Sequence, residues 1–218
     1  MFEGIIFRDR REAGLKLSQL LQKYRGEECV VFGIPRGGVE IGYYVARELN
    51  CLLEVIIPRK IGAPLQPELA VGAVAEDGTV YIEEEVAELV GVSEEYIRSA
   101  VVRELELIKK RLKVYRGEVE VPELSKYKVI VVDDGVATGA TMIASLRFLR
   151  KKNCSRLICA IPVAPPETIH KLRREADEVV CVATPTPFYA IGQFYQDFRQ
   201  LTDEDVLYYL SHSKRLIK

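Results

Sequence analysis

The segment from residue 129 to residue 149 constrains the fold of this chain more than any other stretch. Residues 129–132 are four consecutive apolar residues, which predicts a buried strand. Asp133 and Asp134 follow directly, and a loop of small residues then leads into residues 141–149, whose apolar spacing predicts a helix. A strand whose terminal loop opens a helix is the repeating unit of an α/β sheet.

The same alternation extends along the whole chain, which predicts a doubly wound, mainly parallel α/β sheet flanked by helices. Residues 58–67, rich in Pro, Gly and basic side chains, are predicted to form a long loop. Strands are predicted at residues 29–32, 52–57, 70–75, 79–82, 129–132, 157–162 and 178–182, and helices at residues 8–24, 39–49, 93–114, 141–149 and 166–175. We expect one domain over 1–218, with a helical insert at about 84–116.

Composition narrows the class of protein. With 218 residues, 48% of them hydrophobic, the chain can bury a sizeable core. A net charge of -1 argues against non-specific nucleic-acid binding. No apolar run reaches membrane-spanning length and no signal peptide is evident, so a cytoplasmic protein with no nucleic-acid or membrane partner is expected.

Cysteines and histidines give no sign of a metal cluster. The two histidines, His170 and His212, lack ligand spacing and are expected at the surface. The five cysteines are odd in number and show no C-x-x-C spacing, which favours reduced, buried small hydrophobes in the cytosol: Cys29, Cys51, Cys154, Cys159 and Cys181.

The loop at residues 133–141 has the chemistry of a site for a phosphorylated sugar. The first backbone N–H groups of a helix lack partners within the helix and favour an anion. Thr138 and Thr141 add hydroxyl donors. Asp133 and Asp134 accept hydrogen bonds only, so they suit ribose hydroxyls or a hydrated cation. An ordinary strand-to-helix turn would explain the glycines but not two adjacent acids.

This stretch resembles the motif that binds 5-phosphoribosyl 1-pyrophosphate (PRPP) in type I phosphoribosyltransferases. The shared features are four apolar residues, two acids and a loop ending T-G-x-T. Gly135 departs from the usual aliphatic residue, which is expected to loosen the loop. The resemblance implies that Asp133 and Asp134 hold the ribose hydroxyls and contact Mg²⁺ only indirectly, through the substrate. It assigns the 5-phosphate to Gly135, Val136, Ala137, Thr138, Gly139, Ala140 and Thr141.

A second loop, at residues 34–38, also follows a strand and opens a helix. In the family that it resembles, a short loop in this place binds pyrophosphate, which implies that role for Pro35, Arg36, Gly37 and Gly38. Such loops often contain a strained or cis peptide bond, expected here around Arg36 and Gly37. The alternative is an ordinary turn, because many such turns contain two glycines.

Arg59 and Lys60 are adjacent cations at the end of a predicted strand. Adenine and orotate phosphoribosyltransferases have a similar R-K pair, which implies that these two residues hold pyrophosphate. The loop continuing to residues 66–68 resembles the mobile lid of the family and adds Glu68 as a catalytic candidate. A solvated surface pair is the alternative.

An aromatic segment at about residues 184–200 follows the last predicted strand. Its position resembles that of the family's base-binding hood, which implies that Phe188, Tyr189, Phe194 and Tyr195 stack on a flat acceptor and that Gln193 and Asp197 read its polar groups. The alternative is a small capping core. The charged residues 103–111 are expected to form a solvated helix face.

These resemblances imply Mg²⁺-dependent transfer of a phosphoribosyl group from PRPP to a small nitrogenous acceptor. Ala137 stands where enzymes acting on hypoxanthine or guanine carry an Asp, which disfavours a 6-oxopurine. The motifs F-x-D-R at residues 7–10 and D-F-R-Q at residues 197–200 resemble a bacterial and archaeal group that implies no particular base. A regulatory protein that binds PRPP or a nucleotide, an enzyme acting on another phosphosugar, and a homodimer all stay open.

Overall fold

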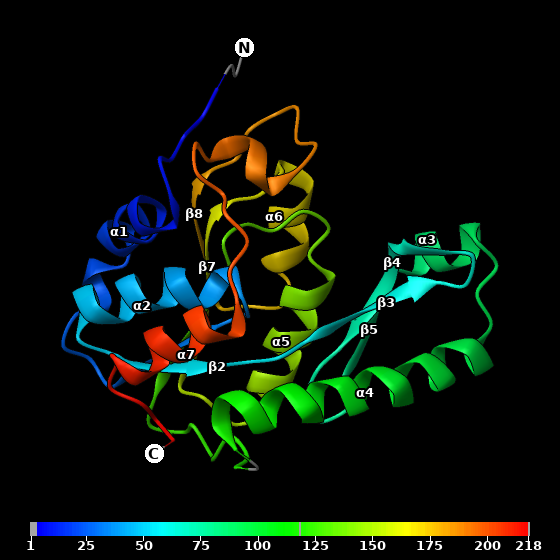
Figure 1. Ribbon diagram of the computed structural model, residues 1–218, viewed down its shortest axis with the longest axis horizontal. Coiled ribbons are helices and arrows are strands. Elements are labelled where there is room, and N and C mark those ends of the chain that lie inside the picture. Colours follow the sequence, from blue (N-terminus) through cyan, green and yellow to red (C-terminus); the bar gives the residue numbers. More distant parts are fainter. Residues whose placement is uncertain (1–3, 118, 218) are drawn as a thin grey trace.

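The computed structural model describes residues 4–117 and 119–217 (Figure 1). Its centre is a five-stranded sheet in the order β2-β1-β6-β7-β8, with every pair of neighbours parallel. The predicted fold class is confirmed. The strands are β1 (Cys29–Gly33), β2 (Leu52–Val55), β6 (Lys128–Val132), β7 (Arg156–Val163) and β8 (Glu178–Ala183).

Helices cover both faces of this sheet because alternate strand residues point to opposite sides. Val31 and Ile130 belong to the core that includes α1 (Arg10–Leu20) and α2 (Gly37–Leu49). Their neighbours in sequence, such as Val131, face α5 (Ala140–Arg150) and α6 (Pro166–Leu172). A short 3₁₀ turn, η1 (Gln22–Tyr24), completes the first predicted helix.

The order of the strands reverses between β1 and β6. The chain moves from β1 outward to β2, then returns to pair β6 with the other side of β1. In open α/β sheets, ligands bind at the carboxyl ends of the strands at such a reversal. The loops after β1 and β6 meet there, and the Ile34 N–H donates to the Val132 carbonyl at 3.0 Å.

A second, antiparallel sheet corrects the prediction of a long loop at residues 58–67. The strands are β3 (Arg59–Ala63), β4 (Gln66–Val74) and β5 (Val80–Ile82), in that order. Ile61 and Ala63 of β3 are buried while Lys60 is exposed, which is the period of a half-buried strand. Flanking prolines and a register shift at Gly62 obscured this period in the sequence.

Two helices follow the small sheet: α3 (Glu84–Leu89) and α4 (Glu94–Arg116). The predicted N-cap of α4 is present, because the Ser93 hydroxyl accepts a hydrogen bond from the Tyr96 N–H. Helix α4 lies alongside β3 and β4, away from α1 (Figure 1). The Tyr96 hydroxyl donates to the Gly62 carbonyl at 2.8 Å, which ties the helix to β3.

The end of the chain contains structure that the sequence analysis missed. A 3₁₀ turn, η2 (Ile191–Phe194), lies within the aromatic segment, and α7 (Asp203–Ser211) packs against α2 (Figure 1). Thr202 and Asp205 form a capping box at the start of α7, a signal that was available in the sequence. Beyond α7, the Leu53 N–H donates to the Lys214 carbonyl at 2.8 Å, so the chain covers the free edge of β2.

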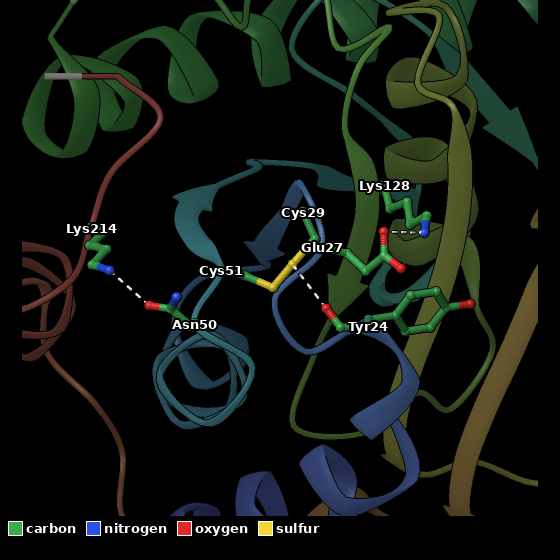
Figure 2. The surroundings of a disulfide bond; sticks show 7 residues. All are labelled: Tyr24, Glu27, Cys29, Asn50, Cys51, Lys128 and Lys214. Atoms are coloured by element: carbon green, nitrogen blue, oxygen red, sulfur yellow. Dashed lines mark hydrogen bonds and ion pairs between the residues drawn. A yellow bond between two sulfur atoms is a disulfide. The ribbon is translucent and has the colours of Figure 1, made fainter.

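Two of the five cysteines form a disulfide, which corrects the prediction that all five are reduced. Cys29 begins β1 and Cys51 precedes β2, with their Cα atoms 5.2 Å apart (Figure 2). Parallel pairing of β1 with β2 puts these positions side by side, and sequence spacing does not reveal that pairing. Cys154, Cys159 and Cys181 are free.

Two smaller expectations agree with the structure. His170 and His212 are both exposed. In the part of the chain that the structure describes, no helix combines the length and the apolar character needed to cross a bilayer.

Candidate functional site

The loop after β1 lies unusually close to the acidic pair. A Cβ on Gly37 would collide with the Asp134 carboxylate, and one on Gly38 would lie 2.7 Å from the Val132 carbonyl oxygen. Both positions therefore require glycine for this close approach. A cis peptide bond is present near the expected place. It joins Pro35 to Arg36, one bond before the bond between Arg36 and Gly37.

Asp133 and Asp134 have different partners. The Asp133 carboxylate accepts a hydrogen bond from the Asp134 N–H at 2.8 Å. The Asp134 carboxylate accepts from Arg10 Nε at 2.8 Å, and its backbone carbonyl accepts from the Tyr195 hydroxyl at 2.5 Å. Arg10 is itself buried. Sequence reasoning missed this arginine as a site residue, although the F-x-D-R motif contains it.

Burial shapes the electrostatics of this pair. Desolvation, reinforced by the neighbouring Asp134, raises the pKa of Asp133 well above its usual range. Desolvation also raises the pKa of Asp134, opposed by the charge of Arg10. Ionising both carboxyls is therefore costly without a partner, and hydroxyl donors or a cation beside Asp133 would relieve that cost.

A cavity of about 600 Å³ opens beside Asp133. It is lined by residues from three of the segments singled out in the sequence. They are Pro35 from the loop after β1, Arg59 and Lys60 from β3, and Asp133 and Thr141 from the β6–α5 segment. Helix α4 forms a further part of its wall with Tyr96, Ala100, Arg103, Glu104 and Arg111.

Several candidates lie apart from the lining of this cavity, among them Glu68 and Arg36. Glu68 is exposed on β4. The Arg36 guanidinium lies 3.7 Å from the Asp203 carboxylate of α7, which also accepts a hydrogen bond from Tyr115. Arg36 must therefore leave or share this acid if it is to contact a ligand.

The loop before α5 has the backbone of an anion site. Gly139 has a φ of +95° and Ala140 begins the helix, so the first N–H groups of α5 have no acceptor within the helix. Ala137 and Thr138 are exposed, and the Thr168 hydroxyl holds the loop by donating to the Ala137 carbonyl. The Val136 N–H donates to the Val163 carbonyl.

Gly135 has a packing role rather than the loosening role expected from the sequence. A Cβ at this position would lie 2.6 Å from Ile191 Cγ2 and 3.0 Å from Val163 Cγ2. The segment that contains η2 therefore packs directly on the loop, in space that an aliphatic side chain at residue 135 would fill.

Two of the four rings of the predicted base hood are buried, which corrects that prediction for Phe194 and Tyr195. Phe194 and Tyr195 are 1% and 4% exposed, so their rings cannot stack on a ligand. Phe188 is half-buried against Phe194, and Tyr189 alone of the four is 85% exposed. The Gln193 side-chain oxygen accepts hydrogen bonds from the backbone N–H groups of Tyr189 and Ala190.

The charged face of α4 also differs from expectation. Lys109 and Lys110 are exposed, as a solvated face requires. Glu104 and Arg111 are half-buried and line the cavity instead. A separate cavity of about 490 Å³ lies against Lys109 and Lys110, and the candidate residues from the sequence are not in its lining within the described ranges.

Comparison with known proteins decides the family. The family model for the phosphoribosyl transferase domain matches residues 10–199. The chain belongs to the phosphoribosyltransferase family. The matched range begins at Arg10, the partner of Asp134, and contains every site residue predicted from the sequence.

Individual relatives agree with this membership. The crystal structure of TT1426 from Thermus thermophilus has a similar fold, with a TM-score of 0.77 and 38% identity, and the match covers 94% of this chain and 98% of that one. Two proteins from Mycobacterium tuberculosis strains CDC 1551 and H37Rv, provisionally named phosphoribosyl transferases, are each 37% identical over 96% of this chain. The chain spans 47%, about half, of their length.

Proposed function

We propose that this chain transfers a phosphoribosyl group from PRPP to a small nitrogenous acceptor and releases pyrophosphate. The observation that carries the proposal is the cavity at the sheet reversal, whose lining includes Asp133, Thr141, Arg59 and Lys60. Carboxylates suit ribose hydroxyls and cations suit phosphates, so this lining offers groups for both parts of PRPP.

In this proposal the loop at residues 135–141 binds the 5-phosphate. Backbone N–H groups at the start of α5 and the hydroxyls of Thr138 and Thr141 are its donors. Asp133 accepts hydrogen bonds from the ribose hydroxyls. Asp134, held by Arg10, adds negative charge behind it as positive charge develops on the ribose ring.

The leaving group requires positive charge. Arg59 and Lys60, which line the cavity, stabilise pyrophosphate in this proposal as its bond to C1 of the ribose breaks and the acceptor nitrogen bonds to C1. Pro35, Arg36, Gly37 and Gly38 form the second side of this site, where glycine lets phosphate oxygens approach the backbone. Glu68, on β4 of the β3–β4 hairpin, is proposed as a further catalytic residue.

The donor set fits a magnesium ion that is bound mainly by its substrate. Among the described residues, no group of three acidic, histidine or cysteine side chains could hold a metal on its own. Asp133 offers a carboxylate, and Mg²⁺ commonly combines one or two carboxylates with waters and substrate phosphates. Bound in this way, Mg²⁺ would neutralise the charge of the departing pyrophosphate.

The acceptor is proposed to be a nucleobase other than a 6-oxopurine, because residue 137 is an alanine. Tyr189, the exposed ring of the aromatic segment, is the candidate for stacking on it. The buried Phe194 and Tyr195 have no such role.

The test is pyrophosphate release from PRPP and Mg²⁺ with adenine, hypoxanthine, guanine, xanthine, uracil, orotate or nicotinate. We expect release with one base, loss of release on adding a chelator, and at least a hundredfold lower rate for Asp133→Asn. Glu106→Gln, an exposed acid on α4, is the control and should keep the wild-type rate. PRPP binding without release for any acceptor would instead favour a regulatory protein of the same fold.

A further inference from the structure

Arg59 already has a partner, and that partner belongs to the helical insert. Its Nε donates to the Glu104 carboxylate of α4 at 2.8 Å. The Arg59 side chain is 35% exposed and that of Glu104 is 19% exposed. Helix α4 therefore sets the direction of a guanidinium that the proposed function assigns to pyrophosphate.

The cavity residues of α4 lie along one stripe of the helix. Tyr96, Ala100, Arg103, Glu104 and Arg111 line the cavity. Their spacings of four, three, one and seven residues correspond to a single helix face. The hydrogen bond from Tyr96 to the Gly62 carbonyl keeps this face against β3.

The charge balance of the cavity indicates what this face binds. The lining contains four cations, Arg59, Lys60, Arg103 and Arg111, against two carboxylates, Glu104 and Asp133. Glu104 is paired with Arg59. Cations outnumber carboxylates in this lining by two, and Arg103 and Arg111 double the number of cations that the R-K pair supplies.

We propose that α4 is a second wall of the pyrophosphate site. Arg111 and Arg103 bind phosphate oxygens opposite Lys60, and Glu104 is a positioning residue that holds Arg59 toward them. The guanidinium groups suit this role because their planar set of donors matches phosphate oxygens. This inference rests on the proposed function and adds the helical insert to its site.

Binding of three ligands separates the two ends of PRPP. Calorimetry with Mg²⁺ would compare inorganic pyrophosphate, PRPP and ribose 5-phosphate on the wild type, Arg111→Gln and Arg103→Gln. We expect each variant to bind pyrophosphate and PRPP about tenfold or more weakly, since hydrogen bonds to charged groups are lost, and to bind ribose 5-phosphate as the wild type does. Arg98→Gln, exposed on the same helix and outside the cavity, is the matched control.

The positioning role of Glu104 has its own readout. Glu104→Gln keeps the shape of the side chain and removes the charge that holds Arg59. We expect kcat to fall several-fold with a smaller change in KM for PRPP, because Arg59 would no longer be held toward the leaving group. Tighter PRPP binding with an unchanged kcat would show that Glu104 only opposes the anion, and would overturn this role.

Failure of this inference is distinct from failure of the proposed function. If the wild type binds PRPP, and both Arg111→Gln and Arg103→Gln bind pyrophosphate as tightly as the wild type does, α4 is not part of the site. If the wild type binds neither PRPP nor pyrophosphate, the proposed function itself is wrong. Melting temperatures close to that of the wild type would verify that each variant is folded, and the two arginine variants test the wall independently.

Discussion

Neighbouring residues of identical chemistry have different environments at the end of β6. Asp134 is buried and paired with Arg10, whereas Asp133 lines the cavity and accepts a hydrogen bond from the backbone. The sequence identified both acids as site residues. It could not divide their roles, because Arg10 lies 124 positions from Asp134 and reaches it only through packing of the chain.

The environment of Asp133 predicts that this residue lowers the stability of the fold while it contributes to ligand binding. The pKa of Asp133 is higher in the folded state than in the unfolded state, so the unfolded state loses the proton first as the pH rises. The free energy of unfolding therefore falls as the pH rises above about 4, the ordinary pKa of this carboxyl. Asp133→Asn should therefore melt at a higher temperature than the wild type at pH 7. At pH 3 the two proteins should melt at similar temperatures. The stability difference at pH 7 should be about 1.4 kcal/mol for each unit by which folding raises the pKa. The same variant should lose PRPP-dependent stabilisation.

Thermal melts of both proteins from pH 3 to pH 8, with and without PRPP and Mg²⁺, would measure this. A variant that is less stable than the wild type at pH 7 would contradict the electrostatic account. A variant that keeps the full PRPP-induced shift would contradict the ribose contact.

Arg10 should contribute to stability as well as to the site. Arg10→Gln leaves the buried Asp134 carboxylate without its cation and removes contacts with the Arg199 carbonyl and the Phe198 ring. We expect a loss of about 3 kcal/mol at pH 7, because breaking a buried ion pair is costly. Urea titration would measure it, with the exposed Arg11→Gln as the control. The loss should shrink near pH 3, where Asp134 takes up a proton.

At the scale of elements, the segment around η2 and the loop before α5 form one packing unit. Gly135 faces Ile191, whose side chain occupies the space that an aliphatic side chain at residue 135 would need.

This close packing predicts a compensating pair of substitutions. Gly135→Val should cost about 1–3 kcal/mol, because its side chain would overlap Ile191, and it should weaken PRPP binding by displacing the loop. Gly135→Val with Ile191→Ala should recover part of both losses. Denaturant midpoints and calorimetry would measure this recovery, and strictly additive losses would rule out direct packing between the two side chains.

For the whole molecule, the end of the chain links elements that are distant in sequence. The buried Glu54 of β2 pairs with Arg215 at 2.6 Å, beside the backbone contact that covers the edge of the sheet. Within the described ranges, Glu54 Oε2 and Arg215 Nε are buried without a hydrogen bond. The pair is therefore only partly satisfied and depends on this closure of the fold.

Removal of one partner should be worse than removal of both. Arg215→Met would leave Glu54 buried without its cation, with an expected loss of about 3–5 kcal/mol. The double variant Glu54→Leu with Arg215→Met should recover most of that loss, because neither charge of this pair remains. Unfolding in urea would compare the three proteins. A double variant no more stable than Arg215→Met would mean that the backbone closure, rather than the charge, matters.

Local pattern was sufficient for much of this protein. The run at residues 129–132, the acidic pair and the loop before residue 141 predicted a strand, a ligand site and a helix because each depends on residues close together in the chain. The parallel sheet followed from the alternation of such units, and the position of the site followed from the rule that ligands bind at the carboxyl ends of strands.

Several features that the sequence did not predict depend on strand pairing or on packing between segments. The hairpin of β3 and β4 needed strand pairing to satisfy its backbone, and the bond between Cys29 and Cys51 needed β1 beside β2. Arg10 reaches Asp134 from another segment, and α4 lines the cavity with Glu104 bonded to Arg59. Residue types and short spacings determined which groups this chain offers to a ligand. Only the tertiary structure decided which of them meet, because burial, pairing and charge are properties of the packed chain.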